Sequence, residues 1–192
     1  MSTHPSSKSA FFVMHVQPPI TDSVDAMLPA RIAAGAAAAR AAGIPVFYVN
    51  IGFRPGHPEV APSFPFREWL IQNQAFVDGV SNSVHEAVAP HSGDVAIRTS
   101  RVSAFTGTDL DVLLRAKGIS HLILTGISTG GVVLSTLIGA LERDLQVTVL
   151  SDGCADANAD VHRTLLHHFS SGAPWHARVI TVAQWTDELL QN

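Results

Sequence analysis

The segment 121–141, HLILTGISTGGVVLSTLIGAL, constrains the fold of this chain more than any other part of it. An apolar run at 122–124 leads into a stretch rich in glycine and hydroxyl groups at 125–131, and an apolar pattern with helical spacing begins at Val132. A strand that passes through a glycine turn into a helix is typical of α/β proteins, where such a turn lies at the carboxyl edge of the sheet and ligands bind. Backbone amides at such a helix start favour an anion or a developing oxyanion.

The same alternation of strand and helix patterns continues along the chain. The expected strands, besides the one at 122–124, are 10–16, 45–51, 94–98, 146–151 and 178–182. The expected helices are 25–42, a weakly helical 69–89, 109–116, 132–141, 160–169 and 183–190, with a long loop at 52–67. Because the strands are almost continuously apolar, they predict a parallel sheet that is buried on both faces. We therefore expect one Rossmann-like, three-layer α/β/α domain with a mainly parallel sheet over residues 9–192, after a flexible tail over residues 1–8.

Composition limits the class of protein. The chain has 192 residues, of which 46% are hydrophobic and 15% charged, as in a compact globular domain. A net charge of −4 gives no electrostatic reason to expect nucleic acid or an anionic membrane as a partner. No apolar run reaches the roughly 18–20 residues of a membrane span. The single cysteine, Cys154, cannot form an internal disulfide, and a polar N-terminus without a secretory apolar core makes a cytoplasmic location the default expectation.

Three motifs carry a resemblance to a known family. The turn GISTGGVVLST at 126–136 is similar to the nucleophile turn of the isochorismatase-like cysteine hydrolases, G-V-x-T-x-x-C-V-x-x-T, and matches it at Gly126, Ile127, Thr129, Val133 and Thr136. The longer runs SAFTGTDLDVLLRAKGISHLILTGIST at 103–129 and VLSDGCADANADVH at 149–162 also resemble family motifs, in the family's order. The resemblance extends from about residue 10 to about residue 190.

The resemblance implies a catalytic triad, and this sequence departs from it at every position. Hydrolytic members use an aspartate as general base, a lysine that orients it and stabilises charge, and a cysteine nucleophile. Here His15 stands at the aspartate position in VMHVQ (13–17), Thr99 at the lysine position beside Arg98, and Val132 at the cysteine position. Since an isopropyl group cannot attack a carbonyl carbon, the covalent route of the family is excluded for this chain.

Other parts of the family site match better. The resemblance implies a cis peptide bond between Ile127 and Ser128, with backbone amides near Ser128 and Val132 facing a reacting carbonyl. The predicted ligand-binding residues are Ser128, Thr129, Gly131, Arg54, Arg98 and Phe105, with the two arginines as anion-binding groups. The metal-binding nicotinamidase branch carries D-x-H after the second strand. This chain has only His57 there, so we expect no metal and no other cofactor.

Two functions of different classes remain open. The first is a pseudo-enzyme that binds a small molecule, with or without a carboxylate, in the family pocket. The second is an enzyme of altered chemistry that cleaves a vinyl ether or a C–N or C–O bond without a covalent intermediate. His15 would then be the acid/base, Ser128 and the turn amides would hold an oxyanion, and Arg54 or Arg98 would anchor a carboxylate. A catalytic His15 should face a closed polar pocket and have a shifted pKa, whereas a binding protein tolerates a His15 that is packed and hydrogen-bonded to backbone. The resemblance also implies a homo-oligomer, a dimer or tetramer, with the apolar helix at 132–141 as a contact.

Overall fold

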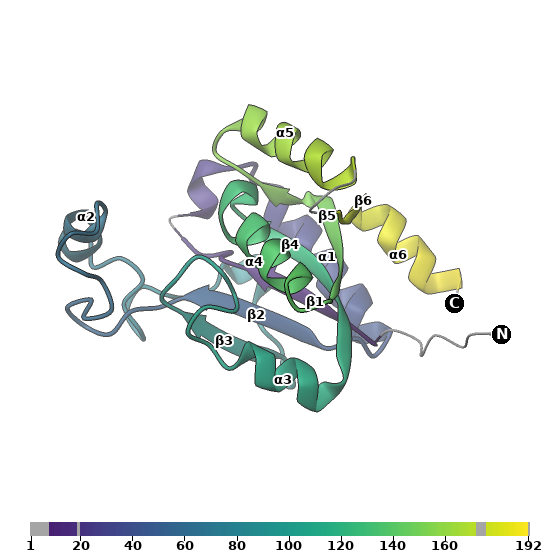
Figure 1. Ribbon diagram of the computed structural model, residues 1–192, viewed down its shortest axis with the longest axis horizontal. Coiled ribbons are helices and arrows are strands. Elements are labelled where there is room, and N and C mark those ends of the chain that lie inside the picture. The colour runs from purple at the N-terminus through teal and green to yellow at the C-terminus, as the bar shows by residue number, and fades with distance from the viewer. Residues whose placement is uncertain (1–7, 19, 172–175, 192) are drawn as a thin grey trace.

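Six parallel strands form a single sheet in the computed structural model, which describes residues 8–18, 20–171 and 176–191 (Figure 1). The sheet order is β3-β2-β1-β4-β5-β6, and every neighbouring pair is parallel. The strands are β1 (Lys8–Met14), β2 (Val46–Ile51), β3 (Val95–Thr99), β4 (Ile119–Ile127), β5 (Gln146–Ala155) and β6 (Arg178–Ile180). This is the doubly wound order, in which the topological switch point lies between β1 and β4. The predicted fold class is confirmed.

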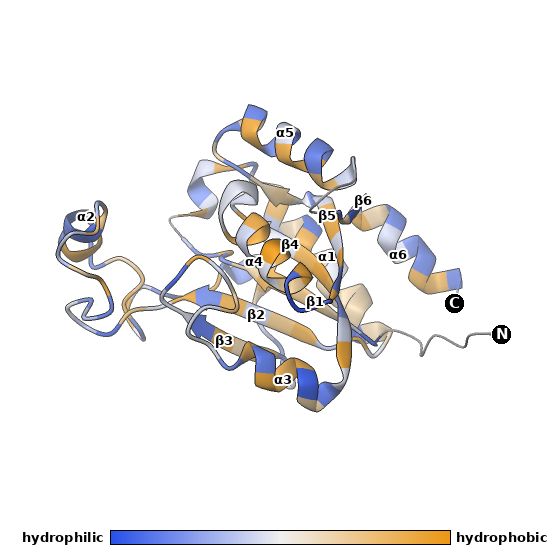
Figure 2. Ribbon diagram, in the orientation of Figure 1, coloured by the Kyte–Doolittle hydropathy of each residue, from blue (hydrophilic) through white to orange (hydrophobic). Residues whose placement is uncertain are grey.

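Helices cover both faces of the sheet and so form the expected three layers. On one face lie α1 (Leu28–Ala41) and α6 (Val182–Gln191), and on the other lie α3 (Leu110–Lys117), α4 (Leu134–Leu141) and α5 (Ala159–Ser170). The central strand β1 serves both layers, because successive side chains of a strand point to opposite faces. Phe12 and Met14 pack in the core with α3, α4 and α5, whereas Phe11 and Val13 pack in the core with α1 and α6. Most of the length of the central strands is accordingly apolar, with polar residues at some strand ends and in β3 (Figure 2).

The predicted elements agree with the structure along most of the chain to within a few residues at their ends, and three differences need a separate account. The predicted tail reached residue 8, but Lys8 begins β1, and residues 1–7 lie outside the described residues. The helix expected from Val132 begins with a π-turn, Thr129–Val133, before α4. The predicted weak helix at 69–89 is wrong for most of its length. The chain there forms the short α2 (Arg67–Gln72), then turns, then a 3-10 turn at Glu86–Val88.

The physical reason for the third difference is that the region does not pack as one helix: the part around α2 packs separately from the sheet core, whereas Val88 packs in the core with α1. Phe53, Leu70 and Phe76 form a small hydrophobic cluster of their own with Val60 and Ala75. In Figure 1, α2 stands apart from the helices that cover the sheet. A helix without a broad apolar surface to cover gains little from being long, and α2 has only 6 residues. Within the described residues, we find no helix with the length and apolar character needed to cross a bilayer.

Candidate functional site

The predicted triad positions lie at the carboxyl edge of the sheet, where the switch point is located. Met14 at the end of β1 is in register with Gly126 of β4, so His15 and the turn after β4 follow from neighbouring strand ends. Gly126 has φ +142°, and a Cβ added to it would lie 2.2 Å from the carbonyl oxygen of Met14, so a larger residue does not fit there. The predicted cis peptide bond between Ile127 and Ser128 is present. Thr99 ends β3, two strands away from β1.

His15 is enclosed by the core. Only 3% of the residue is exposed, its φ is +54°, and its amide donates to the carbonyl of Val49 at 2.8 Å. Its Nε2 atom has no hydrogen-bond partner among the described residues. Burial disfavours the charged imidazolium and lowers the pKa of His15 to about 3. The side chain is therefore neutral near pH 7 and is not in the imidazolium form that acts as a general acid.

Thr99 and Val132 have structural contacts. The Thr99 hydroxyl accepts a hydrogen bond from the amide of Arg101 and donates to the carbonyl of Arg101, each at 3.0 Å. These bonds fix the turn that follows β3. Val132 is 1% exposed and packs in the core between the sheet and α4. Neither residue supplies a nucleophile or a cation.

The turn after β4 is held by bonds that occupy its backbone groups. The amide of Gly130 donates to Oδ2 of Asp156 at 2.9 Å, and the amide of Gly131 donates to the carbonyl of Ser128 at 3.1 Å. The fully buried Thr129 places its hydroxyl 2.7 Å from Nδ1 of His162 on α5. Ser128 and Gly131 are half-exposed. A ligand at this edge thus meets a serine hydroxyl, but the amide of Gly130 already binds a carboxylate.

The two arginines predicted to bind an anion already contact carboxylates. Arg98 pairs through Nε with Asp78 at 2.6 Å and through Nη2 with Glu59 at 2.9 Å, and Arg54 pairs with the same Glu59 oxygen at 2.9 Å. Burial of the Glu59 carboxyl opposes its ionisation, but hydrogen bonds from Arg98 and from backbone amides outweigh that effect and lower its pKa. Phe105, also predicted to bind ligand, is buried against Gly139.

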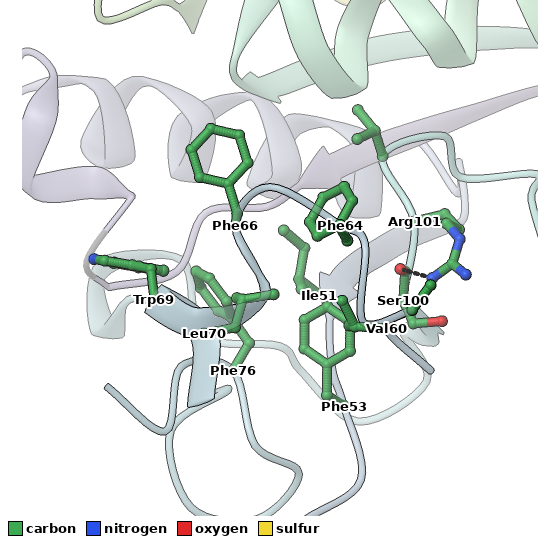
Figure 3. A pocket seen from close by; sticks show the side chains of 12 residues that line it. Ile51, Phe53, Val60, Phe64, Phe66, Trp69, Leu70, Phe76, Ser100 and Arg101 are labelled. Atoms are coloured by element: carbon green, nitrogen blue, oxygen red, sulfur yellow. Dashed lines mark hydrogen bonds between the residues drawn. The ribbon is translucent and has the colours of Figure 1, made fainter. Parts of the chain in front are cut away.

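The best-formed cavity in the described part of the chain lies beside this edge. It has a volume of about 390 Å³ and is walled by the end of β2, by the region of α2 and by the turn after β3 (Figure 3). None of the predicted site residues lines it. The side chains that define it include Ile51, Phe53, Phe64, Phe66, Trp69 and Arg101.

The described residues offer no His, Cys, Asp or Glu cluster with the geometry of a metal site. His57, the one histidine considered as a ligand, is 2% exposed, and its Nε2 lies 2.8 Å from the carbonyl oxygen of Ala75. It ties the loop before α2 to the chain after it.

Comparison with known proteins places the chain in a family. The model of the isochorismatase domain matches residues 9–184. The chain belongs to the isochorismatase family. The resemblance found in its three motifs is thereby confirmed.

Individual relatives of this isochorismatase-family chain include enzymes named for amide hydrolysis. It is 34% identical over 162 residues to the ureidoacrylate amidohydrolase RutB of Methylobacterium radiotolerans, a match that covers 76% of this chain and 62% of the relative. It is 30% identical over 142 residues to the maleamate amidohydrolase of Pseudomonas putida, covering 70% and 63%. The chain thus spans less than two thirds of the length of these relatives.

A solved structure agrees with the fold. The cysteine hydrolase of Pseudomonas syringae pv. phaseolicola superimposes with a TM-score of 0.83 at 24% identity, over 96% of this chain and 93% of the other. At that identity the likeness concerns the fold alone.

The sequence prediction missed the cavity, although one signal was present. Four of the nine phenylalanines and one of the three tryptophans lie between residues 53 and 76, a region interpreted as loop and weak helix. So many aromatic side chains in a segment without strand or helix periodicity indicate a surface that packs on itself or on a ligand. Arg101 was missed because its contacts depend on the turn fixed by Thr99.

Proposed function

We propose that this isochorismatase-family chain is a small-molecule-binding protein that does not hydrolyse amides. One observation carries the proposal: the three triad positions hold a buried neutral imidazole, a hydroxyl bonded within its own turn, and an isopropyl group in the core. Nucleophilic catalysis needs a nucleophile and a base within hydrogen-bond reach of it. His15, Thr99 and Val132 do not provide such a pair of nucleophile and base.

The alternative, acid/base catalysis by His15, is not favoured by its surroundings. A general acid or base works best when its pKa lies near the operating pH. A buried His15 with a pKa of about 3 is a weak base, and near pH 7 it is not in the imidazolium form that would act as the acid. His15 is packed in the core, and its Nε2 atom has no hydrogen-bond partner among the described residues. These surroundings suit a side chain that fills space better than one that transfers a proton.

Binding is supported by the cavity. Small-molecule sites are concave, mostly apolar and typically about 300–1,000 Å³ in volume, and the cavity of about 390 Å³ has these properties. It opens at the ends of β2 and β3, the edge of the sheet where doubly wound proteins bind ligands.

The test is a search for turnover with the substrates in the names of the relatives. Purified protein is incubated with maleamate or with ureidoacrylate, and loss of substrate is followed by proton NMR. The Pseudomonas putida maleamate amidohydrolase serves as the positive control. We expect the signals to match those of a protein-free sample. Hydrolysis by the wild type that disappears in His15→Asn would refute the proposal and restore the acid/base alternative.

A further inference from the structure

The cavity beside α2 has apolar walls that are open to solvent. Phe64 is 47% exposed, Phe66 66% and Trp69 46%, and all three line it. Large aromatic side chains exposed together on one surface are unusual and mark a binding site more often than isolated exposed residues do. Deeper in the cavity, Phe53, Leu70 and Phe76 are buried in their own small cluster, which gives the hollow a fixed floor.

One wall of this aromatic cavity carries a positive charge. Figure 3 shows Arg101 at one side of the view and Trp69 at the other, with Ile51, Phe64 and Val60 between them. The guanidinium of Arg101 donates to the carbonyl oxygen of Ser100 at 2.7 Å and to that of Glu59 at 3.0 Å. Both acceptors are neutral, so these bonds orient the side chain and leave its charge uncompensated.

The neighbouring arginines differ from Arg101 in this respect. Arg54 and Arg98 each contact the carboxylate of Glu59, and Arg98 also contacts Asp78. No ion pair to Arg101 forms within residues 8–18, 20–171 and 176–191. Arg101 therefore lines the cavity as a cation that can contact an anion from outside the protein.

Hydrogen bonds within the protein also hold the backbone and the guanidinium of Arg101 in place before any ligand binds. Thr99 bonds both the amide and the carbonyl group of Arg101. With its backbone held by Thr99 and its guanidinium held by two carbonyls, Arg101 loses less conformational freedom when a ligand binds. A guanidinium held in this way presents its remaining N–H groups to a carboxylate, the planar partner that arginine recognises best.

We propose that this cavity binds an amphipathic organic anion whose aromatic or branched aliphatic body lies among Phe64, Phe66 and Trp69 and whose carboxylate contacts Arg101. The inference rests on the proposed binding function and adds the ligand class and the site. It places the ligand at residues other than the six that the sequence predicted. It also assigns anion binding to Arg101 instead of to Arg54 or Arg98.

The experiment compares a charged probe with its neutral isostere. Binding of 2-naphthoate and of 2-naphthamide to the full chain is measured by isothermal titration calorimetry. The wild type should bind the carboxylate about tenfold or more tightly than the amide, because a hydrogen bond between charged groups is lost with the amide. Arg101→Gln should bind both probes with equal, weak affinity, and Arg101→Lys should recover part of the preference for the carboxylate. Arg163→Gln on α5, which removes an exposed arginine paired with Asp160, should behave as the wild type.

The outcomes separate the two proposals. Equal affinity of the wild type for both probes, or an unchanged preference in Arg101→Gln with a wild-type circular dichroism spectrum, would overturn the role of Arg101. Lack of binding by either probe at millimolar concentration, together with concentration-dependent self-association that Phe66→Ser abolishes, would identify the aromatic surface as a contact between copies and overturn the site. Release of 2-naphthoate and ammonia from 2-naphthamide would refute the proposed non-hydrolytic function and leave the ligand class in place.

Discussion

The buried state of His15 makes a quantitative prediction about stability and pH. In the unfolded chain an imidazole has a pKa of about 6.5, whereas burial lowers the pKa of His15 in the folded protein to about 3. Between these values the unfolded chain binds the proton and the folded protein does not, so a falling pH favours unfolding. The stability associated with neutral His15 is complete above about pH 6.5 and is lost progressively as the pH falls toward the folded pKa.

The size of the effect follows from the two pKa values. At about pH 5 more than nine in ten unfolded chains carry a protonated residue 15, compared with about one in a hundred folded molecules. Linkage then gives a loss of about 2 kcal/mol in the free energy of unfolding between about pH 7.5 and about pH 5 from this one side chain. Such a loss is a large share of the roughly 5–15 kcal/mol that stabilises an ordinary domain.

The assay is urea unfolding, followed by circular dichroism at both pH values, for the wild type and for His15→Asn. Asparagine tolerates the left-handed backbone of residue 15, at φ +54°, better than most residues and does not titrate in this range. Contributions from other groups are shared by the two proteins and cancel in the difference. The wild type should lose about 2 kcal/mol more than the variant between the two pH values. His167→Asn, at an exposed position on α5, is the matched control and should show the wild-type loss.

An equal loss in the wild type and in His15→Asn would refute the reasoning. It would mean that the pKa of His15 is the same in the folded protein as in the unfolded chain. The argument against acid/base catalysis by His15 would fall with it, because that argument depends on the same burial.

Three further predictions concern other sites. Cys154 is buried, and burial raises its pKa to about 12. Iodoacetamide at about pH 8 should therefore leave the folded protein unmodified and alkylate it fully in urea, as measured by mass spectrometry. Rapid labelling of the folded state would contradict this prediction. Gly126→Ala should lower the free energy of unfolding by about 3 kcal/mol or more, or prevent folding, because the added Cβ would clash with the carbonyl of Met14. A variant as stable as the wild type in urea would contradict the described register of β1 and β4. The family resemblance predicts a dimer or tetramer, so sedimentation equilibrium should give two or four times the chain mass of 20.4 kDa, and a monomer at all concentrations would contradict it.

The layered fold could be predicted because its signal is local and repeated. Every residue of β1 from Ala10 to Met14 is buried, and such a strand must be apolar along its whole length. Helix ends carry similar local signals: Gly118 follows α3 in the left-handed conformation, with φ +66°, which glycine adopts without steric cost. Patterns of this kind depend on a few neighbours along the chain and can be interpreted without coordinates.

The contacts around the site could not be predicted in the same way, because they join residues far apart in sequence. Arg98 meets Asp78 and Glu59, which are 20 and 39 residues away, and these partners change an expected anion-binding residue into one that is already paired. The aromatic cavity depends on turns with left-handed backbone at His57 and Phe76, which no apolar periodicity indicates. Local patterns thus located the correct edge of the sheet, but they did not indicate Arg101, the arginine proposed to bind an anion there.

Residue 99 connects a predicted triad position to the cavity. The Thr99 hydroxyl accepts a hydrogen bond from the amide of Arg101, and this bond helps to hold Arg101 at the cavity wall. The lysine that the family resemblance implies at this position has three donors and no acceptor in its ammonium form. A lysine at residue 99 therefore cannot make the bond that Thr99 makes. In this loop, a lysine at residue 99 would leave the amide of Arg101 without the acceptor that the Thr99 hydroxyl provides. Thr99, at the position where the resemblance implies a lysine, thus helps to hold Arg101 in the wall of the aromatic cavity two residues further along.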